Sequence, residues 1–155
     1  MGNKTRAAIG TGREMRSCDG CTMCCKLLGV KSLQKQPDTW CAHCKPGTGC
    51  AIYPQRPVDC AGFDCLWRLG AIDAALRPDE TKAVFALTEY DWLVQVLVDR
   101  HSAWRGTTVE RGIDALRAKG INVIVCQGRE RFLLQSWRAP LLDAMAPLSP
   151  ERAMS

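Results

Sequence analysis

The alternation of apolar and polar positions is regular only in the second half of the chain, where it predicts four strands. Residues 82–90 and 92–99 are apolar and rich in β-branched side chains, which favours a two-stranded hairpin. Residues 121–128 and 131–137 have the same character and are separated by a short polar turn. We therefore expect two hairpins in this part of the chain.

A helix is predicted between the two hairpins. Val109, Ile113 and Leu116 recur at helical spacing, so one face of this segment is apolar. Thr107 is a suitable N-cap, and Gly120 is a suitable end of the helix. The predicted order is β-β-α-β-β, which gives an α+β fold class with an antiparallel sheet.

The first half of the chain lacks this pattern and is rich in cysteine and in turn-forming residues. Residues 24–33 are expected to form a short helix or strand, and residues 64–76 a helix. Proline and glycine between them predict turns. The expected organisation is a disordered basic tail at 1–16, a small metal-stapled cysteine-cluster lobe at 17–77, the α+β lobe at 78–140 and a tail at 141–155.

The net charge of +5 lies in residues 1–35, where seven basic residues face two acidic ones, and the rest of the chain is balanced. A basic arm can attract nucleic acid or an acidic protein. Its basic residues are not interleaved with aromatic ones. We therefore expect an unknown protein partner more than nucleic acid. No secretory signal and no run of about 18 apolar residues is visible, which predicts a cytoplasmic protein without a membrane span.

Nine of the ten cysteines lie between Cys18 and Cys65. Cytoplasmic thiols stay reduced, so this density indicates metal or redox chemistry before structural disulfides. Cys18-x2-Cys21 and Cys41-x2-Cys44 have the spacing of a four-thiolate zinc site. Each C-x2-C turn directs two sulfurs at one point, and two such turns complete a tetrahedron with Zn–S distances of about 2.3 Å.

The five remaining cysteines of this segment suffice for a second site with one thiol to spare. Cys24 and Cys25 are adjacent, and adjacent side chains usually point apart, so one can serve one metal and its neighbour another. His43 is a possible replacement for a thiolate. The candidate metal ligands are Cys18, Cys21, Cys24, Cys25, Cys41, Cys44, Cys50, Cys60 and Cys65, with the sharing of ions left open.

Iron is the alternative metal. Cys18, Cys21 and Cys24 resemble the start of a ferredoxin motif, but Leu28 stands where the fourth cysteine would follow. A cluster completed by a later cysteine remains open. A thiol–disulfide enzyme is a weaker reading, because no βαβ pattern surrounds an isolated C-x-x-C.

Residues 18–67 resemble the YkgJ-type cysteine-cluster family, which is described as a zinc- or iron-chelating domain. The resemblance rests on "CDGCTMCC" at 18–25, "WCAHC" at 40–44, and "GCAIYPQRPVDCAGFDC" at 49–65 with the following Trp67. It implies metal chelation by the cysteines, without an established biochemical role.

Arg56 has a possible role beside such a metal. Pro57 biases Arg56 towards an extended conformation. The guanidinium is a candidate donor to metal-bound sulfurs, since four thiolates on Zn²⁺ leave a net charge of about −2. The alternative is a plain surface arginine. Tyr53, Phe63 and Trp67 are expected to wall the site.

The sequence therefore predicts a metal-binding protein that chelates one or two zinc ions, and it favours a non-enzymatic role because closed four-ligand sites leave no position for substrate. One alternative is an iron or iron–sulfur protein with a redox or catalytic role. The other is a zinc-dependent module that binds nucleic acid or protein.

Overall fold

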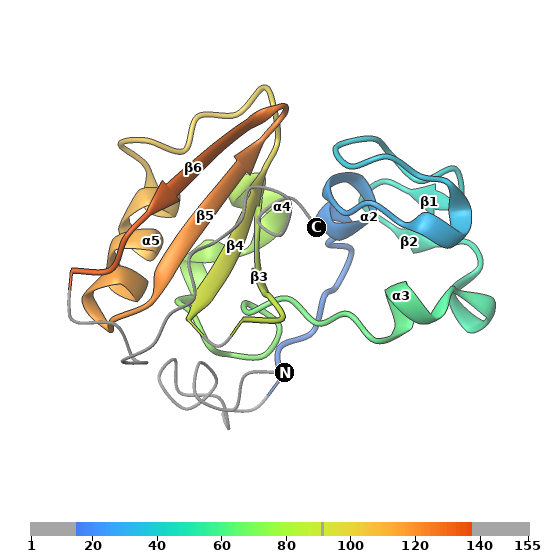
Figure 1. The fold of residues 1–155 in the computed structure, drawn as a ribbon. Coiled ribbons are helices and arrows are strands. Elements are labelled where there is room, and N and C mark those ends of the chain that lie inside the picture. Colours follow the sequence, from blue (N-terminus) through green and yellow to red (C-terminus); the bar gives the residue numbers. More distant parts are fainter. Residues whose placement is uncertain (1–14, 91, 138–155) are drawn as a thin grey trace.

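The computed structural model describes residues 15–90 and 92–137. Figure 1 shows a four-stranded sheet with a helix, α5 (Thr108–Ala118), on one face and the cysteine-rich segment on the other. The strands of the sheet are β3 (Ala83–Leu87), β4 (Leu93–Val98), β5 (Asn122–Gln127) and β6 (Glu130–Leu134). The mixed α+β class is confirmed.

The sheet has the order β3-β4-β5-β6 and is mixed, not antiparallel as predicted. Both hairpins form as expected, since β3–β4 and β5–β6 are antiparallel. The central pair β4–β5 is parallel, with Val96 opposite Val125. The reason is the connection: α5 carries the chain back along the sheet, so β5 starts at the same end as β4.

Both faces of the sheet are covered, and this explains its nearly continuous apolar strands. Phe85 and Val125 belong to a core shared with Ile113 of α5. Their neighbours Val84 and Ile124 point to the other face and pack in a second core with helix α2 (Met23–Leu27). The cysteine segment is therefore anchored on the sheet through α2.

The helix α5 follows its prediction closely. The Thr107 side chain caps it by accepting a hydrogen bond from the N–H of Val109 at 3.2 Å. Val109, Ile113 and Leu116 are all buried against the sheet, as the apolar spacing indicated. A cap and one apolar stripe are local signals, which is why this helix could be placed from the sequence.

The helix predicted over residues 64–76 does not form. Leu66 instead donates a backbone hydrogen bond to the carbonyl of Phe85 at 2.8 Å, and the Trp67 indole donates to the carbonyl of Ala74 at 3.0 Å. Gly70 has a φ of +69°, which ends any helical turn. Only the short 3-10 helix η3 (Ala74–Leu76) remains.

Leu66, Trp67, Ala71 and Leu76 are buried in the same core as α5. The segment from Leu66 onward therefore packs with the sheet, on both sides of the lobe boundary expected at residue 77. The cysteine-rich lobe ends structurally at Cys65.

The rest of the cysteine-rich lobe consists of short elements. They are η1 (Lys31–Leu33), β1 (Cys44–Lys45), β2 (Gly49–Cys50), η2 (Tyr53–Gln55) and α3 (Val58–Ala61), with α4 (Pro78–Thr81) following η3. Where a short helix or strand was expected in residues 24–33, the structure has the helix α2, which ends at Leu27. No residue between 31 and 65 is buried.

The predicted tails at 1–16 and 141–155 lie outside the described residues except at Met15 and Arg16. The Arg16 guanidinium donates to the carbonyls of Trp67 and Ile72 at 3.0 and 2.8 Å, so the ordered chain includes this residue. Within the described ranges, no helix is long and apolar enough to cross a membrane.

We expect Gly112→Ala to destabilise the protein by about 1–2 kcal/mol, although alanine favours a helix by about 1 kcal/mol over glycine. A Cβ on Gly112 would stand 2.6 Å from the Cδ1 of Leu76 and 3.3 Å from the Cζ of Phe85, both in the packed core. Urea unfolding of the variant measures the change. Adding Leu76→Val should recover part of the loss, whereas a stabilised single variant would contradict this packing.

Candidate metal centre

The helix α2 aims its successive side chains in different directions. Met23 and Leu27, one turn apart, are buried against the sheet. Each residue of an α-helix is rotated by about 100° from the last, so Cys24 and Cys25 leave the helix towards different sides. Cys24 lines a cavity beside the sheet, and Cys25 contacts the hairpin formed by β1 and β2.

Four cysteines surround the cavity beside the sheet, and we call them the inner group: Cys18, Cys21, Cys24 and Cys65. The cavity has a volume of about 50 Å³. Its remaining walls are Phe63, Trp67, Arg68, Pro78 and Val84. Phe63 and Trp67 thus wall the thiols as predicted, whereas Tyr53 is 56% exposed and does not line this cavity.

Backbone N–H groups point at the sulfurs of the inner group. The N–H of Arg68 donates to the Sγ of Cys65 at 3.4 Å. Burial raises the pKa of the Cys65 thiol, and the N–H groups of Arg68 and Trp67 oppose this rise. Burial likewise raises the pKa of Cys21, against the N–H groups of Met23 and Asp79. Such donors stabilise sulfur when it carries negative charge.

The outer group consists of the other five cysteines of the segment: Cys25, Cys41, Cys44, Cys50 and Cys60. The backbone N–H of Cys41 donates to the carbonyl of Cys25 at 3.1 Å, which brings α2 to the second C-x2-C motif. Cys44 and Cys50 lie opposite each other in the β1–β2 hairpin. The thiols of Cys25 and Cys44 are hydrogen-bonded to each other.

Three thiols of the outer group, those of Cys25, Cys44 and Cys60, resist ionisation. A hydrogen bond to Cys24, followed by burial, raises the pKa of Cys25. Burial and the neighbouring Cys25 raise the pKa of Cys44 to about 12. Burial and the nearby thiols of Cys25, Cys41 and Cys50 raise that of Cys60. A reactive cysteine needs a lowered pKa, so these thiols suit a cation better than thiol–disulfide exchange.

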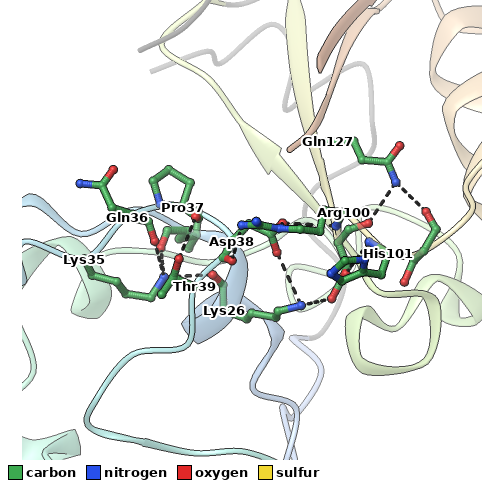
Figure 2. Close-up of polar contacts among 12 residues, drawn as sticks. Lys26, Lys35, Gln36, Pro37, Asp38, Thr39, Arg100, His101 and Gln127 are labelled. Atoms are coloured by element: carbon green, nitrogen blue, oxygen red, sulfur yellow. Dashed lines mark hydrogen bonds and ion pairs between the residues drawn. The ribbon is translucent and has the colours of Figure 1, made fainter. Parts of the chain in front are cut away.

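Lys35 supplies a positive charge beside the outer group, which the sequence analysis did not anticipate. Its ammonium donates to the carbonyls of Lys26 at 3.0 Å and of Leu28, at the end of α2 (Figure 2). Burial lowers the pKa of Lys35, and the thiols of Cys41 and Cys25 oppose this shift. No spacing rule marks Lys35, because it reaches the thiols only through the fold.

Residues 20–22, beside Cys21 of the inner group, also contact the β1–β2 hairpin of the outer group. The buried hydroxyl of Thr22 accepts from the N–H of Gly47 at 3.0 Å and contacts the thiol of Cys44. Gly20 has a φ of +82°, and a Cβ there would lie 2.8 Å from the carbonyl oxygen of Gly47. The close approach of these two turns therefore requires glycine at position 20.

Both C-x2-C motifs form the expected tight turns. The N–H of Cys21 donates to the carbonyl of Cys18 at 2.8 Å, and that of Cys44 to the carbonyl of Cys41 at 3.0 Å. Their grouping differs from the prediction, because Cys18 and Cys21 share the inner cavity while Cys41 and Cys44 lie beside Cys25. The position of one motif relative to the other depends on α2, which lies between them in the chain.

Metal-supporting roles for His43 and Arg56 stay predictions. The Arg56 guanidinium lies over the ring of Tyr53, 3.9 Å from the centroid. His43 offers its carbonyl to the N–H of Ala51 at 2.8 Å, and no contact of its ring with the thiols is seen in the described structure. The positive charge whose pKa the outer thiols influence is that of Lys35, which donates to backbone carbonyls.

The thiols approach one another without closing on a single point. Among the described residues, no three side chains of His, Cys, Asp or Glu stand close enough to hold an ion as they are placed. All ten cysteines are free thiols. Cysteine sulfur is the donor that zinc and iron–sulfur centres use, so the chemistry of the two groups fits these metals once the side chains rotate inwards.

Ion pairs fix the cysteine-rich lobe to the loop after β4 (Figure 2). Lys26 of α2 pairs with Asp99 and lies 3.5 Å from Asp38. Arg100 donates to Asp38 at 2.7 Å. Gln127 donates to the carbonyl of Asp99 at 3.0 Å and so holds the loop to the end of β5. This network lies at the same interface as the packing of Met23 and Leu27.

No family model matches the chain, and no curated protein or solved structure is significantly similar to it. The resemblance of residues 18–67 to the YkgJ-type family therefore stays a prediction from the motifs. Function has to be argued from the geometry of the thiols.

Proposed function

We propose that the protein binds metal ions through the thiolates of its cysteine-rich lobe, with zinc as the first candidate. The observation that carries this proposal is the absence of any buried residue between 31 and 65. Hydrophobic burial is the main force that folds a chain, and short segments without it depend on disulfides or metals. Nine free thiols lie in or next to this segment.

The electrostatics of the thiols support a cation. Burial raises the pKa of several of them, so they stay protonated until a positive charge draws the proton away. The backbone N–H groups at Cys65 and the ammonium of Lys35 then offset the charge of the thiolates. Bound zinc supplies a cross-link of four thiolates, and it favours a structural over a catalytic role.

Iron is the second candidate, and the inner group favours it most. The cavity there is lined by Phe63, Trp67 and Val84, so a bound centre would be shielded from water on that side. Burial and N–H bonds to sulfur are also the levers that set the potential of iron–sulfur centres.

Metal analysis of anaerobically purified, untagged protein separates these candidates. We expect one or two zinc ions per chain and a colourless solution. Iron with acid-labile sulfide in a brown solution would show that the protein holds an iron–sulfur centre and not zinc. A reduced, folded protein that holds neither metal would contradict the proposal.

A further inference from the structure

We propose that the adjacent cysteines Cys24 and Cys25 divide the thiols between two separate metal sites of unequal character. This inference rests on the proposed function. The inner site consists of Cys18, Cys21, Cys24 and Cys65. The outer site consists of Cys25, Cys41 and Cys44, with either Cys60 or Cys50 as the fourth thiol. Each site takes one soft divalent ion such as Zn²⁺.

The division follows from the placement of α2. Met23 and Leu27 fix the rotation of this helix, because both are buried in the core with Val84 and Ile124. With that rotation fixed, Cys24 opens into the inner cavity and Cys25 meets the second C-x2-C motif. The thiols of Cys24 and Cys25 are hydrogen-bonded to each other, so the two sites adjoin at this pair.

The inner site is built on residues that fold without metal. Cys65 directly precedes Leu66, which is fully buried and hydrogen-bonded to β3. Cys21 and Cys24 flank the buried Thr22 and Met23. The apolar core and the ion pairs of Lys26 hold these positions. Loss of the inner ion therefore leaves the backbone around it in place.

The outer site holds a segment that has no core of its own. Cys41, Cys44 and Cys60 all lie between residues 31 and 65, where no apolar side chain is buried. They join the packed part of the protein through Cys25, through the buried Thr22, and through the loop that Lys35 and Asp38 fix. Binding of the outer ion is therefore coupled to folding of this segment.

The test compares Cys24→Ser with Cys25→Ser in the full-length zinc-loaded protein. We expect two zinc ions in the unsubstituted chain and one in each variant, so each substitution halves the zinc content. Amide hydrogen exchange distinguishes the sites: Cys24→Ser should keep the protection of residues 31–65, and Cys25→Ser should lose it. Cys126→Ala, which removes a buried thiol outside both groups, should keep both ions.

Further observations guard against a variant that does not fold. Cys65→Ser and Cys41→Ser repeat the comparison away from α2, and chelation of the unsubstituted protein should release zinc in two phases. A single ion that both Cys24→Ser and Cys25→Ser remove would overturn the division and leave the proposed function intact. A folded, reduced chain that binds no zinc at all would overturn both.

Discussion

Chelation of the bound metal is expected to abolish the hydrogen-exchange protection of residues 31–65 while the four-stranded sheet keeps its own. The two regions differ in what holds them. The strands β3, β4 and β5 share two apolar cores that contain no thiol of the inner or outer group as a buried member. Residues 31–65 have no buried apolar side chain, and we propose that metal cross-links hold them.

The experiment needs a reductant throughout, so that disulfides do not replace the metal. Hydrogen exchange with mass-spectrometric readout compares peptides from residues 31–65 with peptides from 83–98. Returning zinc should restore the protection, and magnesium, which prefers oxygen ligands, should not. Unchanged protection of residues 31–65 in protein shown to be metal-free would refute the idea that metal folds this segment.

The parts of the fold that could be predicted are those with local causes. Each strand is a short apolar run, and α5 has its Thr107 cap and apolar stripe in a single segment. The parallel pairing of β4 and β5 was not predicted, because apolar runs show neither which strands are neighbours nor whether neighbouring strands run in the same direction. The sequence 64–76 contains good helix formers, but two other hydrogen bonds decide its conformation. The N–H of Leu66 donates to the carbonyl of Phe85, which is distant in the sequence, and the Trp67 indole donates to the carbonyl of Ala74.

The same distinction applies to the thiols. The two C-x2-C turns and the separation of Cys24 from Cys25 follow from local geometry. Which thiols meet was not predictable from spacing, because it depends on how Met23 and Leu27 rotate α2 against the sheet. Lys35 reaches the outer group only because the chain folds back to the end of α2. To predict which thiols bind the same metal, the packing of the intervening helix α2 must therefore be known in addition to the cysteine spacing.

The ion pair between Lys26 and Asp99 is expected to be the strongest polar contribution to the docking of the two lobes. The side chains of Lys26, Asp99 and Asp38 are 16%, 10% and 9% exposed. Replacing Lys26 by methionine keeps most of the side chain but leaves two buried carboxylates with less positive charge. Removing one partner of a buried pair costs about 3 kcal/mol or more, and we expect Lys26→Met to lower the unfolding free energy by about that amount.

Denaturant unfolding at neutral pH measures this cost, and Lys31→Met, at an exposed position, is the matched control. Adding Asp99→Asn to Lys26→Met should recover part of the stability, because it removes one of the uncompensated charges while keeping an oxygen for the N–H of His101. Equal stabilities of Lys26→Met and Lys31→Met would show that the pair adds nothing to docking.

The pH dependence provides an independent check. Burial of the Asp99 carboxyl opposes its ionisation, but the Lys26 ammonium and the N–H of His101 outweigh burial and lower its pKa. The stabilisation is therefore complete above the unfolded pKa of about 3.9 and is lost as the pH falls through the lower folded value. The stability gap between the unsubstituted protein and Lys26→Met should narrow only below about pH 4, where protonation of Asp99 removes the charge that Lys26 compensates. A gap that closes already between pH 7 and pH 5 would assign the effect to other groups.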